Sequence, residues 1–305
     1  MKKILMTAAA AIALAALAVA QTQPAPAPKT APSAGTQAPA TPAPAQAAPL
    51  KGLKPPPQAK SQEEYSAFLT AAQAAAAPDP AAAEPAVRDF QVKFPGSELT
   101  PQLYLALLFS YNGARNLDKA ADMGREVLKV EPTNPVAAVY TGLILAESTR
   151  GTDIDATQKF DEANKDANSG LQNVEANLML PGNVTQEQAD GMKADLKATA
   201  YDVLGLVAFN RNDFSTAEKN FRESIRLRPQ PGDPMSHLRL ALSLDKQNKY
   251  KEALPEAQKA VSLANPQDHV SKTAQAEVER LQKLTGGGSG TTAPATQPAT
   301  PPPTK

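Results

Sequence analysis

Apolar residues recur at helical spacing along most of this chain, from about residue 61 to residue 284. Ala, Leu, Lys, Glu and Gln dominate that region, and runs of β-branched residues, which would favour strands, are missing. Pro and Gly interrupt the apolar stripes at regular intervals, as helix ends require. These breaks fall at residues 78–80, 95–96, 132–135, 181–182, 229–234 and 266. The pattern predicts an all-α chain built from consecutive helices.

One spaced set of residues occurs twice within this helical region. The first set is Tyr104, Leu107, Tyr111, Ala120, Val127 and Pro132, and the second is Tyr201, Leu204, Gly205, Ala217, Phe221 and Pro229. In both sets an aromatic residue precedes a Leu by three positions, an Ala follows that Leu after thirteen, and a Pro comes twelve later. A fixed pattern of this length indicates a stacking unit that shares its core with its neighbours.

These residues resemble the tetratricopeptide repeat (TPR), an antiparallel pair of helices about 34 residues long. The resemblance implies an all-α superhelix of about five helix pairs plus a C-terminal capping helix. In that family, small residues let the helices approach closely while large residues fill the gaps between turns. The repeat domain is expected to span residues 61–284.

The individual units differ in how well they fit the repeat. Residues 198–231 fit best, residues 98–131 fit with Gly124 in place of an aromatic residue, and residues 233–266 fit with His237 at a bulky position. The first unit, residues 61–94, is degenerate and Ala-rich, which is typical of a terminal repeat.

The middle of the chain departs from the regular unit length. A unit around Gly142 has extra residues in its turn, and its second helix is predicted to continue towards Asn177. Thr185 followed by Gln188 predicts a capping box at the start of the next helix. A last helix over residues 268–284 has one apolar stripe and is expected to cover the open end of the repeats.

Both ends of the chain differ in composition from the helical region. Residues 1–20 combine Lys2 and Lys3 with an Ala/Leu/Ile run and an Ala-x-Ala site before Gln21, the pattern of a secretory signal peptide. An uncleaved membrane anchor is the alternative, although the run is short and Ala-rich for a stable span. Residues 21–60, rich in Pro and Ala, and 285–305, rich in Gly, Pro and Thr, have the composition of disordered linkers. A Pro-rich ligand is the alternative for these tails, but no basic residue punctuates a P-x-x-P core. The chain is therefore expected to be exported, to the periplasm or the extracellular space of a bacterium.

Charge and cysteine content exclude several classes of function. Lys and Arg equal Asp and Glu at 31 each, so no basic excess favours nucleic acid or anionic lipid as a partner. Cys is absent, which removes disulfides, thiolate metal ligands and thiol nucleophiles. Trp is also absent, which disfavours a surface for stacking carbohydrate.

Catalytic and metal-binding patterns are missing from the sequence. The two histidines, His237 and His269, lie outside any H-E-x-x-H arrangement, and no Walker, dinucleotide-binding or G-x-S-x-G pattern occurs. His237 is expected to pack within a repeat and His269 to face solvent. We therefore expect a non-enzymatic protein with no catalytic residues, no bound metal and no cofactor.

The resemblance also places a partner-binding groove along the first helices of the repeats. The predicted groove residues are Gln102, Leu105, Phe109, Asn112, Val139, Leu143, Thr199, Asp202, Leu206, Phe209, Leu238, Leu242 and Asp245. The family's carboxylate-clamp type has Lys and Asn in its groove. This chain has Leu105 and Asp202 where the Lys would be, and Phe109 where the Asn would be. The groove is therefore predicted to be apolar and suited to an amphipathic helix or an extended peptide.

Three functions are compatible with this interpretation. The favoured one is a scaffold or adaptor in the cell envelope that binds another protein or peptide in the groove. The second is a self-associating structural protein, a possible homo-oligomer, and the third is an accessory subunit of a cell-wall enzyme. The groove is either open to a partner, filled by the chain's own residues 171–180, or covered by a second copy.

Overall fold

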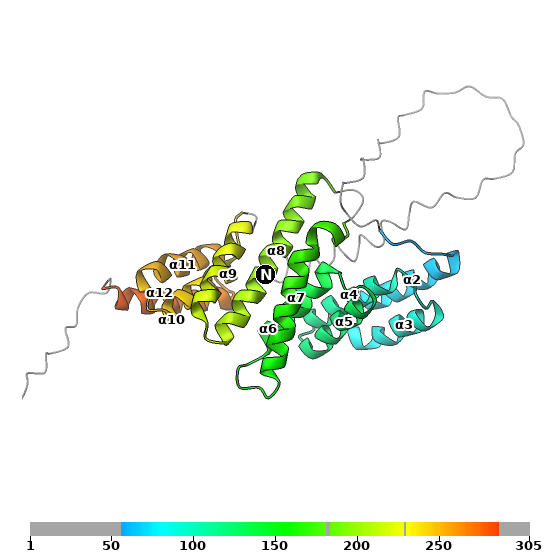
Figure 1. Cartoon of the computed structure of the whole chain (residues 1–305), viewed down its shortest axis with the longest axis horizontal. Coiled ribbons are helices and arrows are strands. Elements are labelled where there is room, and N and C mark those ends of the chain that lie inside the picture. Colours follow the sequence, from blue (N-terminus) through cyan, green and yellow to red (C-terminus); the bar gives the residue numbers. More distant parts are fainter. Residues whose placement is uncertain (1–55, 181–183, 229, 287–305) are drawn as a thin grey trace, which may run out of the picture. The chain divides into compact units, whose positions relative to one another are not determined.

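A computed structural model describes residues 56–180, 184–228 and 230–286 of the 305-residue chain. The proposed signal peptide (residues 1–20) and most of the two proposed linkers (residues 21–55 and 287–305) lie outside the described residues. The described part contains eleven helices and no strand (Figure 1). The predicted all-α class is therefore confirmed.

The helices form consecutive pairs within two compact units, one ending at Gly232 and one beginning at Asp233. The pairs of the first unit are α2 (Gln62–Ala75) with α3 (Pro80–Lys93), α4 (Thr100–Gly113) with α5 (Leu117–Val130), α6 (Pro135–Ser148) with α7 (Ala156–Asn177), and α8 (Gln186–Asn210) with α9 (Phe214–Leu227). The second unit contains α10 (Pro234–Lys246), α11 (Tyr250–Leu263) and α12 (His269–Leu284). These are the five predicted pairs and the predicted terminal helix.

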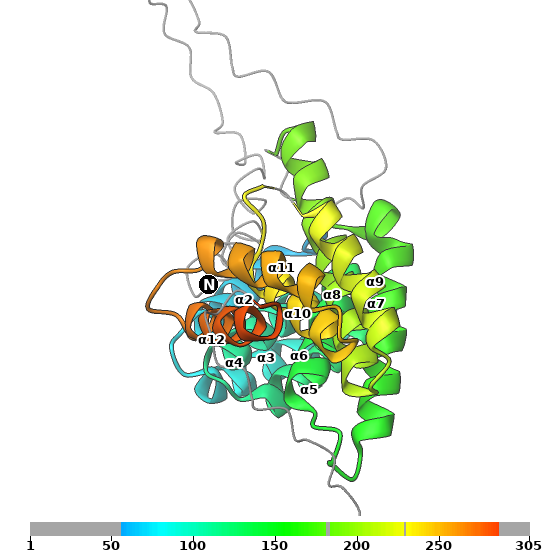
Figure 2. The same ribbon diagram turned by 90° about the vertical axis from the view of Figure 1, so that its left-hand side faces the viewer.

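In the first unit the first and second helices of the pairs lie on different sides. Figure 2 shows α3, α5, α7 and α9 each to the right of the first helix of its own pair. Most helices begin at a side chain that accepts a backbone N–H. Asn116, Asn134 and Asp213 act in this way, and the capping box of Thr185 and Gln188 is present as predicted. The residue before such a helix therefore determines locally where the helix begins.

Most repeat positions that were expected to pack are buried, whereas Tyr201 and Leu204 are half-buried. Tyr104, Leu107, Ala120, Ala217 and Phe221 are each fully buried. In the second unit, Val270, Ala274, Val278 and Leu281 form the buried stripe of α12 that the sequence predicted. The spacing of small and large residues thus specifies the packing inside the pairs.

Two glycines allow helices to approach closely. A Cβ on Gly205 would lie 2.5 Å from the ring of Phe221, its partner across the α8–α9 pair. A Cβ on Gly124 would lie 1.9 Å from Thr141 Oγ1, so the missing aromatic residue at this position has a structural reason. Helix α5 packs so closely against α6 of the next pair that a side chain at position 124 would collide with Thr141.

Candidate partner-binding surface

All thirteen predicted groove residues lie on the first helices α4, α6, α8 and α10. Five of them are buried: Leu105, Val139, Thr199, Asp202 and Leu238. The other eight are half-buried: Gln102, Phe109, Asn112, Leu143, Leu206, Phe209, Leu242 and Asp245. The buried five stabilise helix packing, so a partner would contact mainly the half-buried eight.

An aromatic pair joins two neighbouring first helices. Phe109 of α4 and Tyr140 of α6 meet edge to face, with ring centroids 4.9 Å apart. Burial, with the negative charge of Asp195 adding to its effect, raises the pKa of the Tyr140 hydroxyl to about 12. Tyr140 is not among the predicted groove residues because it follows Val139, the position that the repeat register assigns to the groove.

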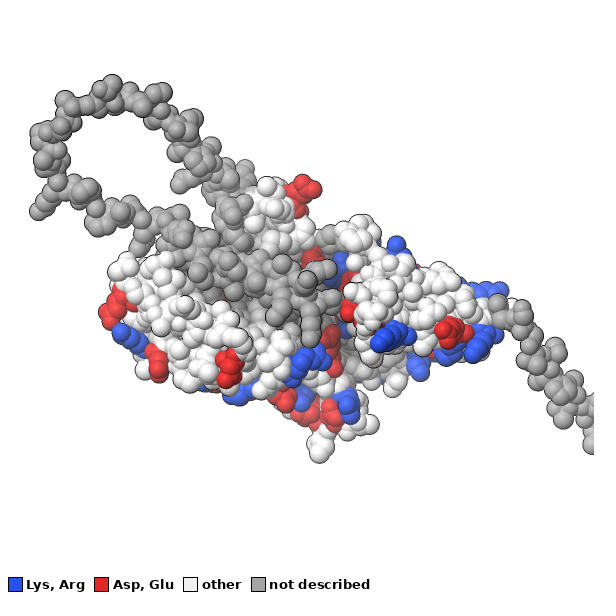
Figure 3. Space-filling view, turned by 180° about the vertical axis from the view of Figure 1, so that it is seen from behind, with Lys and Arg blue, Asp and Glu red and all other residues white. Residues whose placement is uncertain are grey.

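Charged residues are distributed unequally between the two sides of the first unit. Helix α4 carries no charged residue and α6 carries only Glu147. The second helix α5 carries six charged residues: Asp118, Lys119, Asp122, Arg125, Glu126 and Lys129. Figure 3, seen from behind, shows a broad uncharged face of the first unit with charged side chains gathered along its lower edge. Helices α4 and α6 therefore present an almost uncharged surface. The first helix α8 differs from them, with six charged residues: Glu187, Asp190, Lys193, Asp195, Lys197 and Asp202.

The chain's own segment Leu178–Leu180, which follows α7, reaches this surface. The side-chain amide of Gln102 donates a hydrogen bond of 3.4 Å to the sulfur of Met179. Leu178 and Leu180 are buried in the core cluster that also contains Leu105 and Val139. Part of the segment 171–180, which the sequence analysis considered as a filling for the groove, thus lies against a predicted groove residue.

One arginine forms ion pairs with two aspartates of α8. Arg228, directly after α9, contacts Asp202 at 2.6 Å and Asp195 at 2.8 Å. Asp202 is therefore neutralised within its own repeat, where the family's carboxylate clamp would have a lysine. Arg228 could not be predicted from the repeat because its partner Asp195 precedes the unit, outside the 34-residue register.

Four other predicted residues contact their own unit. Phe209 meets Phe214, at the start of α9, with centroids 5.3 Å apart. In the second unit, Leu238 and Leu242 pack in a cluster with Val270 and Ala274 of α12, and Asp245 forms an ion pair with Arg280. The cap α12 therefore covers the predicted groove residues of α10.

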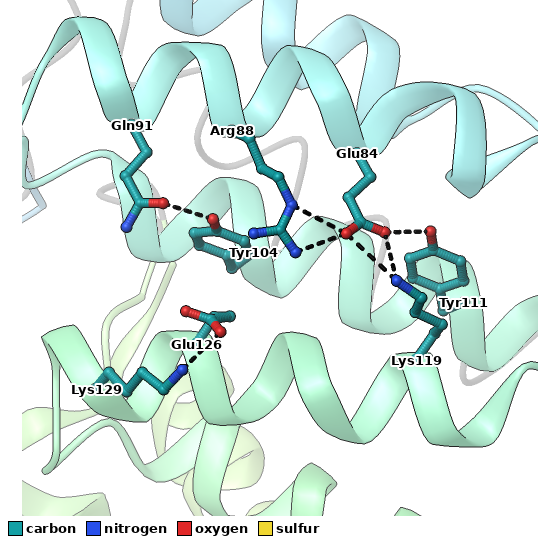
Figure 4. Close-up of polar contacts among 8 residues, drawn as sticks. All are labelled: Glu84, Arg88, Gln91, Tyr104, Tyr111, Lys119, Glu126 and Lys129. Atoms are coloured by element: carbon teal, nitrogen blue, oxygen red, sulfur yellow. Dashed lines mark hydrogen bonds and ion pairs between the residues drawn. The ribbon is translucent and has the colours of Figure 1, made fainter.

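A polar network connects the α2–α3 pair to the α4–α5 pair (Figure 4). The Tyr111 hydroxyl donates to Glu84 at 2.7 Å, Arg88 contacts Glu84 at 2.7 Å, and Lys119 contacts it at 3.2 Å. Burial raises the pKa of Glu84, but the hydrogen bonds from Arg88, Tyr111 and Lys119 outweigh it and lower the pKa to about 2. The network joins α3, α4 and α5, so these charges stabilise stacking of the repeats.

The histidines show no catalytic arrangement. His237 Nδ1 lies 2.7 Å from Glu256 within the second unit, and His269 is exposed, as predicted. Among the described side chains, no three of His, Cys, Asp and Glu gather as a metal site would require. Within residues 56–180, 184–228 and 230–286, no helix combines the length and apolar content needed to span a membrane.

Comparison with known families finds a match for one of the repeats. Residues 198–231 match the tetratricopeptide repeat family, with the same bounds as the best predicted unit. A search of the curated proteins found no match.

Several solved structures are similar to this chain at low sequence identity. A structure titled MamA RS-1 ArsTM double mutant is 15% identical, covers 69% of this chain and 99% of its own, and gives a TM-score of 0.50. TTC0263, a thermophilic TPR protein of Thermus thermophilus, is 15% identical, covers 71% and 99%, and scores 0.45. Pseudomonas aeruginosa pilF is 16% identical, covers 74% and 93%, and scores 0.47. The observed helix pairs, the match over residues 198–231 and the first of these structures together show a fold of TPR-type helix pairs. Such repeats generally serve as non-catalytic scaffolds for protein partners.

Proposed function

We propose that this protein, a chain of TPR-type helix pairs, is an exported scaffold that binds another envelope protein through the face formed by α4 and α6, in which the one charged residue is Glu147. The observation that carries the proposal is the separation of charge: α4 has no charged residue, whereas α5 has six. A solvated surface ordinarily carries mixed charges, and a contiguous uncharged face is typical of an interaction site. The signal-like sequence of residues 1–20 supports export.

The chemistry of the face indicates the kind of partner. Phe109, Tyr140 and Leu143 offer half-buried apolar groups, and Leu206 of the neighbouring helix α8 adds another. Gln102 and Asn112 add side-chain amides on α4. Such a surface fits an amphipathic helix or an extended peptide with apolar side chains, and it offers no cation to grip a terminal carboxylate. Aromatic side chains of this kind are the residues most often responsible for binding energy.

A crosslinked capture from envelope extract tests the proposal. The purified chain is compared with Phe109→Asp, which places a charge in the face, and with Val92→Asp, a control on the exposed side of α3, where Val92 is 81% exposed. We expect one partner to be enriched at least tenfold by the parent and by the control, and lost in Phe109→Asp. Equal capture by all three folded forms would contradict the face as the binding site.

The same preparation tests export and the alternative of self-association. The intact mass of the chain recovered from the envelope should correspond to a start at Gln21, and a full-length mass would contradict cleavage. Light scattering across micromolar concentrations should give a monomer. A dimer that Phe109→Asp dissociates would favour a structural homo-oligomer instead.

A further inference from the structure

The segment Leu178–Leu180 lies at one end of the proposed binding face, and Met179 contacts Gln102 from 77 positions away in the sequence. We propose that this segment is an internal occupant of the face, which a partner peptide of the same uncharged, Leu- and Met-containing chemistry displaces. The proposal rests on the function proposed above and adds its regulation. The affinity of the face for a partner then depends on the fraction of molecules in which the segment is released.

The segment matches the surface that it covers. It consists of Leu, Met and Leu, and α4 beneath it carries no charge. Leu178 and Leu180 are 4% and 7% exposed, so each contributes apolar burial that a partner side chain of similar size would replace. The side-chain amide of Gln102 would exchange one weak acceptor, a thioether, for a better acceptor on a partner peptide.

The helices beside the segment are held by contacts elsewhere. Helices α7 and α8 have 22 and 25 residues, whereas α4, α5, α6 and α9 have 14 each. The longer helices are joined by Glu175, which contacts Lys193 at 3.0 Å and also pairs with Lys197. Asn173 and Asn177 add hydrogen bonds along the last turns of α7. None of these contacts involves α4 or α6, so release of the segment from α4 leaves the contacts between α7 and α8 in place.

Binding of a defined probe tests the proposal. The probe is a fluorescein-labelled peptide with the sequence of Glu175–Leu180, and binding is measured by fluorescence anisotropy. The released form is the double variant Leu178→Ser/Leu180→Ser, with helical content checked by circular dichroism. We expect the double variant to bind the probe about tenfold more tightly than the parent. A tenfold difference means that the segment is released in about one-tenth of the parent molecules.

A tethered form provides the matched control and does not depend on the folding of the serine variant. The chain has no Cys, so the variant Gln102→Cys/Met179→Cys has thiols at these two positions alone. A bismaleimide with a reducible spacer then links the two positions. We expect the tethered protein to lose probe binding and to regain it when the spacer is reduced. The same sample before and after reduction differs in the tether alone.

Two results would overturn the proposal. Equal affinity of the parent, released and tethered forms would show that the segment does not compete for the face. Absence of binding in every form would show that the face does not recognise this chemistry. In both cases the capture experiment with Phe109→Asp still decides the proposed function, so the two failures are distinguishable.

Discussion

Three residues adopt the left-handed backbone region at the same place in three repeats. Arg115, Asn212 and Asn248 have φ values of 63°, 62° and 62°, each at the turn between the first and second helix of a pair. In each turn the N–H of the following residue donates to a carbonyl five positions back; the pairs are Asn116 to Tyr111, Asp213 to Ala208 and Lys249 to Leu244. Asn tolerates this conformation, whereas Arg adopts it at a steric cost of about 1 kcal/mol.

We therefore expect Arg115→Gly to stabilise the protein. The free energy of unfolding should rise by about 0.5–1 kcal/mol, measured by urea denaturation, because glycine reaches positive φ without a clash. Ala114→Gly is the control: Ala114 has φ −76°, so this change should lower stability instead. A loss of stability in Arg115→Gly would contradict the strain at this turn.

Asp166 of α7 makes stability depend on pH. It is 7% exposed, and its Oδ2 has no hydrogen-bond partner among the described residues. Burial, with the negative charge of Glu162 adding to its effect, raises the pKa of Asp166 from 3.8 to about 7, and Lys165 and Arg125 oppose the shift. The folded state therefore binds more protons than the unfolded state between about pH 4 and pH 7, and the free energy of unfolding falls as pH rises through that window.

Replacing Asp166 removes this dependence. We expect Asp166→Asn to raise the free energy of unfolding by about 2 kcal/mol at pH 7.5 and to change it little at pH 4. Asp161→Asn, at a 67% exposed side chain on the same helix, should change stability by less than about 0.5 kcal/mol at either pH. The same gain at pH 4 and pH 7.5 would contradict the assigned titration.

At the scale of the helix pair, close packing decides which glycines are required. Gly205 and Gly191 both lie within α8, but a Cβ at Gly205 would contact the Phe221 ring whereas a Cβ at Gly191 would contact nothing within 4 Å. Gly205→Ala should destabilise the protein by about 1–3 kcal/mol because the ring must move. Gly191→Ala should stabilise it by about 0.5–1 kcal/mol through helix propensity, measured in the same denaturation series. Equal effects of the two substitutions would contradict the packing of this pair.

The helix pairs could be predicted from the sequence because their packing is local. The spacing of Tyr104, Leu107 and Ala120 records which side chains meet inside one pair, and the match over residues 198–231 has the predicted bounds. The capping box at Thr185 predicted the start of α8 at Gln186, and the repeat register did not. The register describes packing within a unit and does not specify the length of a helix.

The contacts of the candidate site were harder to predict. The approach of Met179 to Gln102 joins positions 77 residues apart through a segment with no regular period. Burial of Leu238 beside Val270 depends on where the cap α12 packs, which periodicity does not specify. Groove residues could therefore be assigned to the correct helices, but their exposure could not be deduced.

At the scale of the whole molecule, we expect a partner to bind the face of α4 and α6 and not the charged helix α5. The absence of Cys permits a direct measurement, in which a single benzophenone–maleimide is attached at Asn112→Cys on α4 or at Asp122→Cys on α5. Asn112 is half-buried in the proposed face and Asp122 is exposed on the other side. Illumination in envelope extract, followed by mass spectrometry, identifies what lies against each position. The account predicts one foreign protein crosslinked from Asn112→Cys and not from Asp122→Cys. A partner crosslinked from Asp122→Cys alone, or equally from both positions, would contradict it.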